Sequence, residues 1–262
     1  MDLQQRLEKL VAERNDYECK DKEGVTNKRV IPLLGASAVG KSTIIGCAKR
    51  RALLWGIDSI AEAGTTGTRA PREGDPENYH MGIPHEEAIE LIEEGRPVNW
   101  SLMPTGDIYM TLPGDFPATY NFMACLPDSL PMLKRAGFSA VNPAYIVTAV
   151  DEWEQQLASR LYTADTINDP DGKRTYRPDA FGRVEEAISS LEYGLNTGTI
   201  KISNMPGKEG LKKATDTILK IVRGKASISP HSLEMEEFEK NRREMYSRAI
   251  DIAWEITRAT QK

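Results

Sequence analysis

The segment "VIPLLGASAVGKSTIIG", residues 30–46, decides the fold. An apolar run ends at Gly35, and Gly40, Lys41 and Ser42 follow at the spacing G-x-x-x-x-G-K-[ST], before apolar residues return at helical spacing. This Walker A spacing, between a strand and a helix, predicts a loop whose backbone N–H groups turn inward around a phosphate chain. The helix that begins near Lys41 adds the positive end of its dipole to the same site.

The loop predicts specific roles for its polar residues. We expect Lys41 to reach the β- and γ-phosphates of a nucleoside triphosphate, and the Ser42 hydroxyl to ligate Mg²⁺. The residues expected to surround the ATP phosphates are Gly35, Ala36, Ser37, Ala38, Val39, Gly40, Lys41, Ser42 and Thr43. The alternative is a glycine-rich turn in which the lysine is incidental.

The bulk properties describe an ordinary globular chain of 262 residues, with 28% charged and 40% hydrophobic residues. A net charge of −5 argues against nucleic acid as the main partner. Cys19, Cys47 and Cys125 lack metal-ligand spacing and are typical of a reducing compartment. The first residues are charged throughout, and the sequence has no long apolar span. We therefore expect a cytoplasmic protein that has no membrane segment.

Apolar runs alternate with amphipathic segments along the chain, which predicts an α/β fold with a parallel sheet flanked by helices. Residues 62–82 are dense in Gly, Pro, Thr and charge and are expected to be mostly loop. Pro32 conflicts with a central strand because it lacks a backbone donor. The expected strands are 29–34, 107–112, 119–126, 144–150 and 199–203. The expected helices are 2–14, 41–54, one within 84–97 that Gly95 ends, 129–137, 151–161, 179–193, 208–223 and 232–260.

Three further features limit the chemistry. "TTGTRAPR", residues 65–72, carries arginines whose planar donors suit phosphate, although a solvated loop is the alternative. Asp128 directly follows an apolar strand, where P-loop enzymes place a carboxylate beside Mg²⁺, and capping of the next helix is the alternative. Arg160 and Arg183 flank a basic loop, as expected of a lid that neutralises charge during phosphoryl transfer. Lys173, Arg174 and Arg177 of that loop are either part of it or simply exposed.

Together these features resemble the guanylate kinase family, in which S-x-T-T-R-x-P-R and a downstream tyrosine follow the phosphate loop. The resemblance covers about residues 29–224. It implies that the acceptor nucleotide is bound by Thr65, Arg69, Arg72, Tyr79, Asn99, Tyr109 and Thr111. It also implies that Lys41, Arg160, Arg183 and Asp128 are catalytic, and that Ser42 and Asp128 lie beside Mg²⁺.

The implied architecture is a P-loop kinase fold at residues 29–224, with an acceptor-binding insert at about 62–117 and a lid at about 155–183. Residues 1–28 form an N-terminal helix and linker, and residues 225–262 a C-terminal helix. The apolar stripe Phe238, Met245, Ala249, Ile252 and Ile256 in that last helix predicts docking onto the chain's own core, with a homodimer as the alternative.

The implied activity is transfer of the ATP γ-phosphoryl group to a nucleoside monophosphate, with GMP as the first guess. One departure concerns the base, because the family has a glutamate where this chain has Asn99, and an amide cannot accept two hydrogen bonds in the same bidentate way. A kinase for another phosphorylated acceptor, such as a sugar phosphate, is therefore an alternative. A guanylate-kinase-like protein-binding module is another, although such modules typically have degraded phosphate loops. A regulatory GTPase is disfavoured because the sequence lacks an N-K-x-D element.

Overall fold

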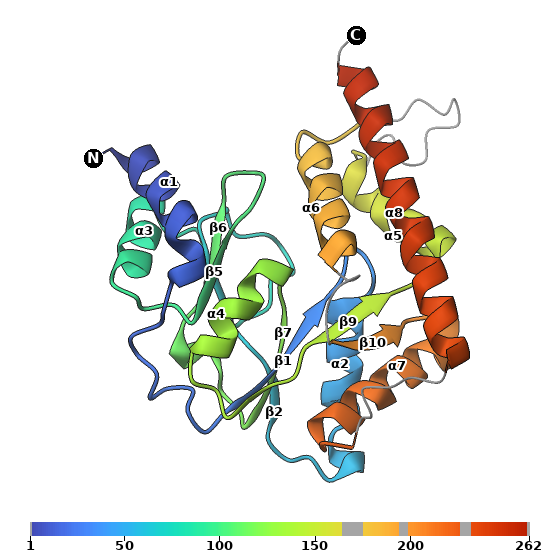
Figure 1. The fold of residues 1–262 in the computed structure, drawn as a ribbon, viewed down its shortest axis with the longest axis horizontal. Helices are drawn as coiled ribbons and strands as arrows, with labels where there is room; N and C mark the ends of the chain where they lie inside the picture. The colour runs from blue at the N-terminus through green and yellow to red at the C-terminus, as the bar shows by residue number, and fades with distance from the viewer. Residues whose placement is uncertain (1, 164–174, 194–198, 226–231, 261–262) are drawn as a thin grey trace. The chain divides into compact units, whose positions relative to one another are not determined.

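The computed structural model contains one mostly parallel sheet with the strand order β10-β9-β1-β7-β2, and β8 also pairs with β1. The structure describes residues 2–163, 175–193, 199–225 and 232–260. The strands are β1 (Arg29–Leu34), β2 (Ile60–Glu62), β7 (Tyr120–Ala124), β8 (Ala140–Val141), β9 (Ala144–Val147) and β10 (Ile200–Ser203). Flanking helices alternate with these strands along the chain, which confirms the predicted α/β class (Figure 1).

The chain divides into two units, Met1–Pro32 with Ala52–Pro143, and Leu33–Arg51 with Ala144–Lys262. Strand β1 contributes to both units. Its residues Arg29 and Val30 pair with β8 in the first unit, whereas Leu33 and Leu34 pair with β9 in the second.

Pro32 lies within β1, which is a central strand, although its missing backbone donor had suggested that a central strand would not accept it. It follows the residues that pair with β8 and precedes those that pair with β9. The strand therefore passes from one neighbour to the next at Pro32, and a residue that lacks an N–H is tolerated where the ladder changes partner.

The first unit has a second sheet of order β4-β3-β6-β5. Its strands are β3 (Thr65–Gly67), β4 (Tyr79–Met81), β5 (Asn99–Leu102) and β6 (Ile108–Thr111). The prediction that residues 62–82 are mostly loop missed the short strands β3 and β4, and β5 was also missed. Three-residue strands are too short to show an alternating pattern, so they form only because tertiary pairing supplies their hydrogen bonds.

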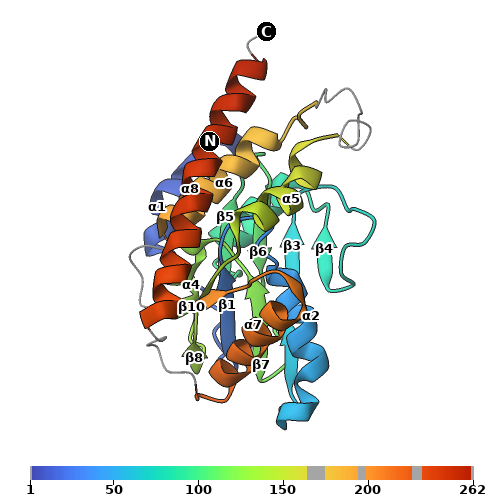
Figure 2. The same cartoon turned by 90° about the vertical axis from the view of Figure 1, so that its right-hand side faces the viewer.

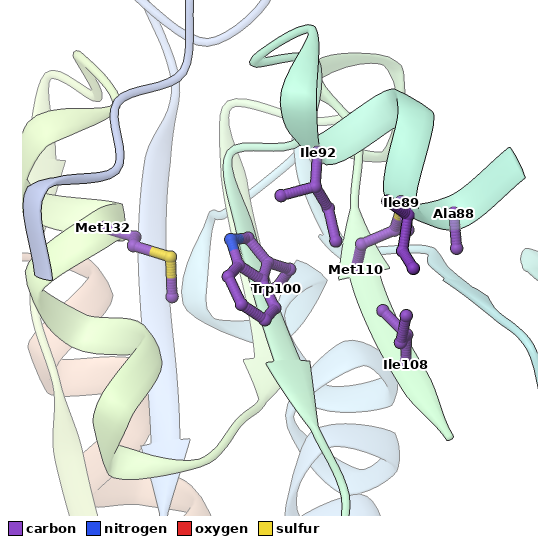
Figure 3. Packing of buried hydrophobic residues seen from close by; sticks show 7 residues of the cluster. All are labelled: Ala88, Ile89, Ile92, Trp100, Ile108, Met110 and Met132. Atoms are coloured by element: carbon purple, nitrogen blue, oxygen red, sulfur yellow. The ribbon is translucent and has the colours of Figure 1, made fainter. Parts of the chain in front are cut away.

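Helix α3 (His85–Glu93) covers one face of this second sheet. Ala88, Ile89 and Ile92 of the helix pack with Trp100 and Met110 of the sheet, together with Ile108 and Met132 (Figure 3). The N-terminal helix α1 (Leu3–Glu13) lies beside α3 and is fastened to it by an ion pair between Arg6 and Glu93 of 2.7 Å. The remaining helix of this unit is α4 (Leu130–Arg135).

The second unit contains α2 (Lys41–Arg51), α5 (Val150–Leu161), α6 (Ala180–Tyr193), α7 (Gly207–Val222) and α8 (Ser232–Thr260). Helix α8 runs along α6 and contacts β10 (Figure 2). The stripe predicted in α8 is buried, from Phe238 to Ile256, so it docks onto the chain's own core as expected. Dimerisation stays a prediction. Within the part of the chain that the structure describes, every helix is too short or too polar to cross a membrane.

Candidate functional site

The loop between β1 and α2 has the backbone of a phosphate-binding loop. Gly35, Ala38 and Gly40 have φ values of 132°, 70° and 86°, so the chain enters the left-handed region three times within six residues. A Cβ at Gly35 would collide with the carbonyl oxygen of Ile146, and one at Gly40 would lie 2.5 Å from the side-chain nitrogen of Asn204. Both glycines are therefore required by conformation and by space.

Lys41 folds back over this loop. Its Nζ donates hydrogen bonds to the carbonyl oxygens of Gly35, at 2.5 Å, and Ala36, at 2.9 Å. The ammonium group is thereby held within the loop, beside the backbone that the sequence predicts to surround phosphates. Ser42 and Thr43 are exposed in the first turn of α2, where their hydroxyls are accessible to a ligand.

Helix α5 brings an arginine to the phosphate loop. Nη1 of Arg160 donates to Oγ of Ser37 at 3.0 Å, and the indole of Trp153 donates to the Ser37 carbonyl oxygen at 2.8 Å. The side chain of Asn204 closes the other end of the loop by donating to the carbonyl oxygen of Val39 at 3.0 Å. Arg160, predicted to belong to the lid, thus contacts the loop directly, and Trp153 had not been foreseen.

The other lid arginines converge on one acid in the described part of the lid. Nη2 of Arg183 lies 2.6 Å from Oδ2 of Asp179, and Nε of Arg177 lies 3.7 Å from Oδ1. Burial raises the pKa of Asp179, but the hydrogen bonds and charges of these arginines outweigh burial, so the pKa is lowered overall. Lys173 and Arg174 lie outside the described residues.

The predicted acceptor residues gather on one face of the second sheet. Directly paired residues share a face, and the register pairs Asn99 with Thr111, Ser101 with Tyr109, and Thr65 with Tyr79. Trp100, Ile108 and Met110 alternate with them and point to the opposite face, toward α3 (Figure 3). The strand alternation therefore separates a polar face, here called the acceptor face, from the packed core.

Arg69 is fixed beside the acceptor face by an acid that the sequence analysis missed. Its guanidinium makes two hydrogen bonds to Asp75, of 2.8 and 2.6 Å, and lies 6.0 Å from the ring centroid of Tyr109. The hydrogen bonds from Arg69, joined by the backbone N–H of Arg72, lower the pKa of Asp75 to about 2. The Arg72 side chain itself is exposed. Only the acidic character of the loop sequence hinted at such a partner.

The two tyrosines of the acceptor face remain protonated. Burial raises the pKa of Tyr79 and the pKa of Tyr109, although a hydrogen bond with Thr65 opposes the rise at Tyr79, and the charge and hydrogen bond of Arg69 oppose it at Tyr109. A protonated phenol can donate a hydrogen bond to an anionic ligand. Their predicted role in binding the acceptor stays a prediction.

Asn99 has a polar atom without a partner. The residue is 5% exposed, and its Oδ1 makes no hydrogen bond. A buried carbonyl oxygen without a donor costs about 1–3 kcal/mol, so this atom is suited to accept from a ligand.

Asp128 lies in the 3₁₀ turn η4 (Pro127–Ser129) and does not cap α4, whose N-cap is Ser129. Its carboxylate instead forms an ion pair with Arg14 and accepts a hydrogen bond of 3.2 Å from Oγ of Ser101. Asp128 belongs to the first unit, and its role beside Mg²⁺ stays a prediction.

The residues present fit a magnesium ion that is held mainly by its nucleotide. Among the described residues, no group of three or more His, Cys, Asp or Glu side chains could form a metal cage. Mg²⁺ in nucleotide sites usually needs only one or two protein ligands, because phosphate oxygens and water complete its octahedral shell. The exposed Ser42 hydroxyl next to Lys41 meets that requirement.

A phosphate-binding loop at the end of a parallel strand, with an arginine bound to it, defines this chain as a P-loop α/β protein. No family model matches the chain. It is 35% identical over 80 residues to a guanylate kinase of Mycolicibacterium paratuberculosis, covering 30% of this chain and 33% of the relative. It is 36% identical over 75 residues to a guanylate kinase of Mycobacterium bovis, covering 28% and 33%.

A solved guanylate kinase from Anaplasma phagocytophilum aligns with a TM-score of 0.47 and 11% identity, over 81% of this chain and 95% of that one. The chain spans about a third of the length of the curated relatives it matches. These curated matches support the guanylate kinase-like resemblance that the motifs suggested.

Proposed function

We propose that this protein is an ATP-dependent phosphotransferase that moves the γ-phosphoryl group of ATP to a nucleoside monophosphate, with GMP as the first candidate. The observation that carries the proposal is the phosphate loop, in which Lys41 is held over the backbone and Arg160 is bound to Ser37. Two cations at one phosphate loop suit stabilisation of the charge on a transferring phosphoryl group.

Separate groups of residues would bind ATP, stabilise the transferring phosphoryl group and bind the acceptor. The loop N–H groups and Lys41 bind the ATP phosphates, and Arg160 neutralises negative charge that develops on the equatorial oxygens. Arg69, Tyr79 and Tyr109 hold the phosphate of the acceptor. Ser42 would be the protein ligand of a bound Mg²⁺, which would supply further neutralisation of the phosphate charge.

A kinase for another phosphorylated acceptor is the second candidate, and Asn99 supports it. The single unpaired Oδ1 offers one acceptor, which leaves one of the two adjacent N–H groups of guanine without a partner. A protein-binding module is a weaker alternative, because the phosphate loop is intact in sequence and in backbone conformation.

The test is ADP release from ATP and Mg²⁺ with GMP, IMP, dGMP, AMP, CMP, UMP and several sugar phosphates as acceptors. Lys41→Met is expected to lower turnover by about 10²–10³-fold, because it removes a charged donor to the transferring group. Lys49→Met, on the exposed side of the same helix, is the matched control and should retain activity. Full activity of Lys41→Met would refute the proposed phosphotransferase activity. Turnover with a sugar phosphate alone would show that the acceptor is a sugar phosphate and not a nucleoside monophosphate.

A further inference from the structure

The N-terminal segment places an arginine at β5, the strand at one edge of the second sheet. Arg14, in the 3₁₀ turn η1 (Arg14–Asp16), forms an ion pair with Asp128 and donates from Nη2 to Oγ of Ser101 at 3.3 Å. Its guanidinium carbon also lies 5.2 Å from the centroid of the Trp100 ring. The side chain is 16% exposed. Arg14 is thus fixed by two residues of β5, Trp100 and Ser101, and by Asp128 of η4.

The position of Ser101 connects Arg14 to Asn99. The two residues lie on the same face of β5, two positions apart, which is about 7 Å along a strand. Three polar atoms near this stretch are buried without partners: Nε of Arg14, Oδ1 of Asn99 and, on the opposite face of the strand, Nε1 of Trp100. The first is a donor and the second an acceptor, so these two are suited to a ligand with one complementary atom for each.

Arg14 also changes what Asp128 offers. A free carboxylate only accepts hydrogen bonds, and one beside Ser101, two positions along β5 from Asn99, would favour a ligand that carries an additional amino group. In this structure the Asp128 carboxylate already accepts from Arg14 and from Ser101. The buried acceptor left for a ligand on this stretch of the described acceptor face is therefore Oδ1 of Asn99.

We propose that Arg14 is a specificity-determining residue that makes acceptor binding indifferent to a 2-amino group on a purine base. This inference rests on the proposed nucleotide acceptor. Asn99 accepts from a single N–H of the base, and Arg14 keeps the Asp128 carboxylate from binding a second one. Hypoxanthine and guanine, which differ only in the 2-amino group, are then bound about equally well.

The test compares equilibrium binding of IMP and GMP by calorimetry, with turnover measured separately. The wild-type protein is expected to bind the two nucleotides within about threefold. Arg14→Met frees the carboxylate to accept from the 2-amino group, and is expected to shift the preference toward GMP by about tenfold or more, the effect of one charge-assisted hydrogen bond. Arg14→Lys keeps the charge beside Asp128 and should restore the wild-type ratio.

Arg6→Met is the control for docking of the N-terminal segment, because Arg6 pairs with Glu93 on α3 away from the acceptor face. It should leave the IMP to GMP ratio unchanged. Arg14→Gln provides a second removal of the charge if Arg14→Met does not fold. An unchanged ratio in both removal variants, a strong wild-type preference for GMP, or no binding of either nucleotide would overturn the inference. Binding that shifts as expected without any turnover would instead refute only the proposed phosphotransferase.

Discussion

Substitutions at Gly40 and Asn204 are predicted to be energetically coupled. The side-chain amide of Asn204 donates a hydrogen bond to the phosphate loop, and the same amide occupies the space that a Cβ at position 40 would need. Asn204→Ala removes the 3.0 Å hydrogen bond to the Val39 carbonyl and should cost about 1 kcal/mol of unfolding free energy. Gly40→Ala places a methyl group at φ 86°, which costs about 1–3 kcal/mol as backbone strain. The new Cβ would lie 2.5 Å from the Asn204 nitrogen, so the amide must move and the same hydrogen bond is lost.

The single substitutions should therefore cost about 2–4 kcal/mol for Gly40→Ala and about 1 kcal/mol for Asn204→Ala. The double variant loses that hydrogen bond only once, so its cost should fall about 1 kcal/mol short of the sum. Urea unfolding of the four proteins measures this coupling, with Gly114→Ala as the control because nothing lies within 4 Å of its added Cβ. Costs that add within about 0.5 kcal/mol would show that the Asn204 amide does not limit the loop.

Two further predictions concern other ion pairs. The pKa of Asp75 is lowered to about 2 from 3.8. Its carboxylate therefore stabilises the fold fully at pH values above the ordinary pKa of 3.8, and this contribution is lost as the pH falls through about 2. Denaturation at several pH values should show a shallower decline between about pH 4 and 2 for Asp75→Asn than for the wild type. Arg248→Met breaks the pair that joins α8 to Glu154 of α5, the helix that carries the arginine bound to the phosphate loop. Arg248→Met should lower kcat several-fold at saturating ATP. Lys240→Met, which breaks an exposed pair within α8, should leave kcat unchanged. Equal kcat values for the two variants would show that the pair between α8 and α5 does not contribute to catalysis.

The parts of the molecule that the sequence predicts well are those with contiguous signals. The phosphate loop is specified by residues 35–42 alone, and the backbone reaches the left-handed region at Gly35, Ala38 and Gly40. The buried strands β7 and β9 and the long helix α8 follow from apolar runs and periodicity. The strands β3 and β4 have no such signal, because three residues show neither a period nor a composition that differs from a loop.

Partners across long sequence separations account for what the sequence leaves open at the candidate site. Asn204 contacts Val39 across 165 positions, and Arg14 contacts Ser101 across 87. No local pattern could show that a charged N-terminal segment reaches β5, because the contact depends on the packing of α1 against α3.

The two kinds of information answer different questions about function. A local motif such as the phosphate loop fixes the chemistry, because one stretch of backbone supplies most of the contacts to the phosphates. In the function proposed above, selection among acceptors depends on side chains from separate elements of the first unit, namely Arg14, Asn99 and Asp128. A change at Asn99 alone therefore does not define the acceptor. On our proposal its effect depends on whether Arg14 or the ligand pairs with the Asp128 carboxylate, and the comparison of IMP with GMP binding measures that competition.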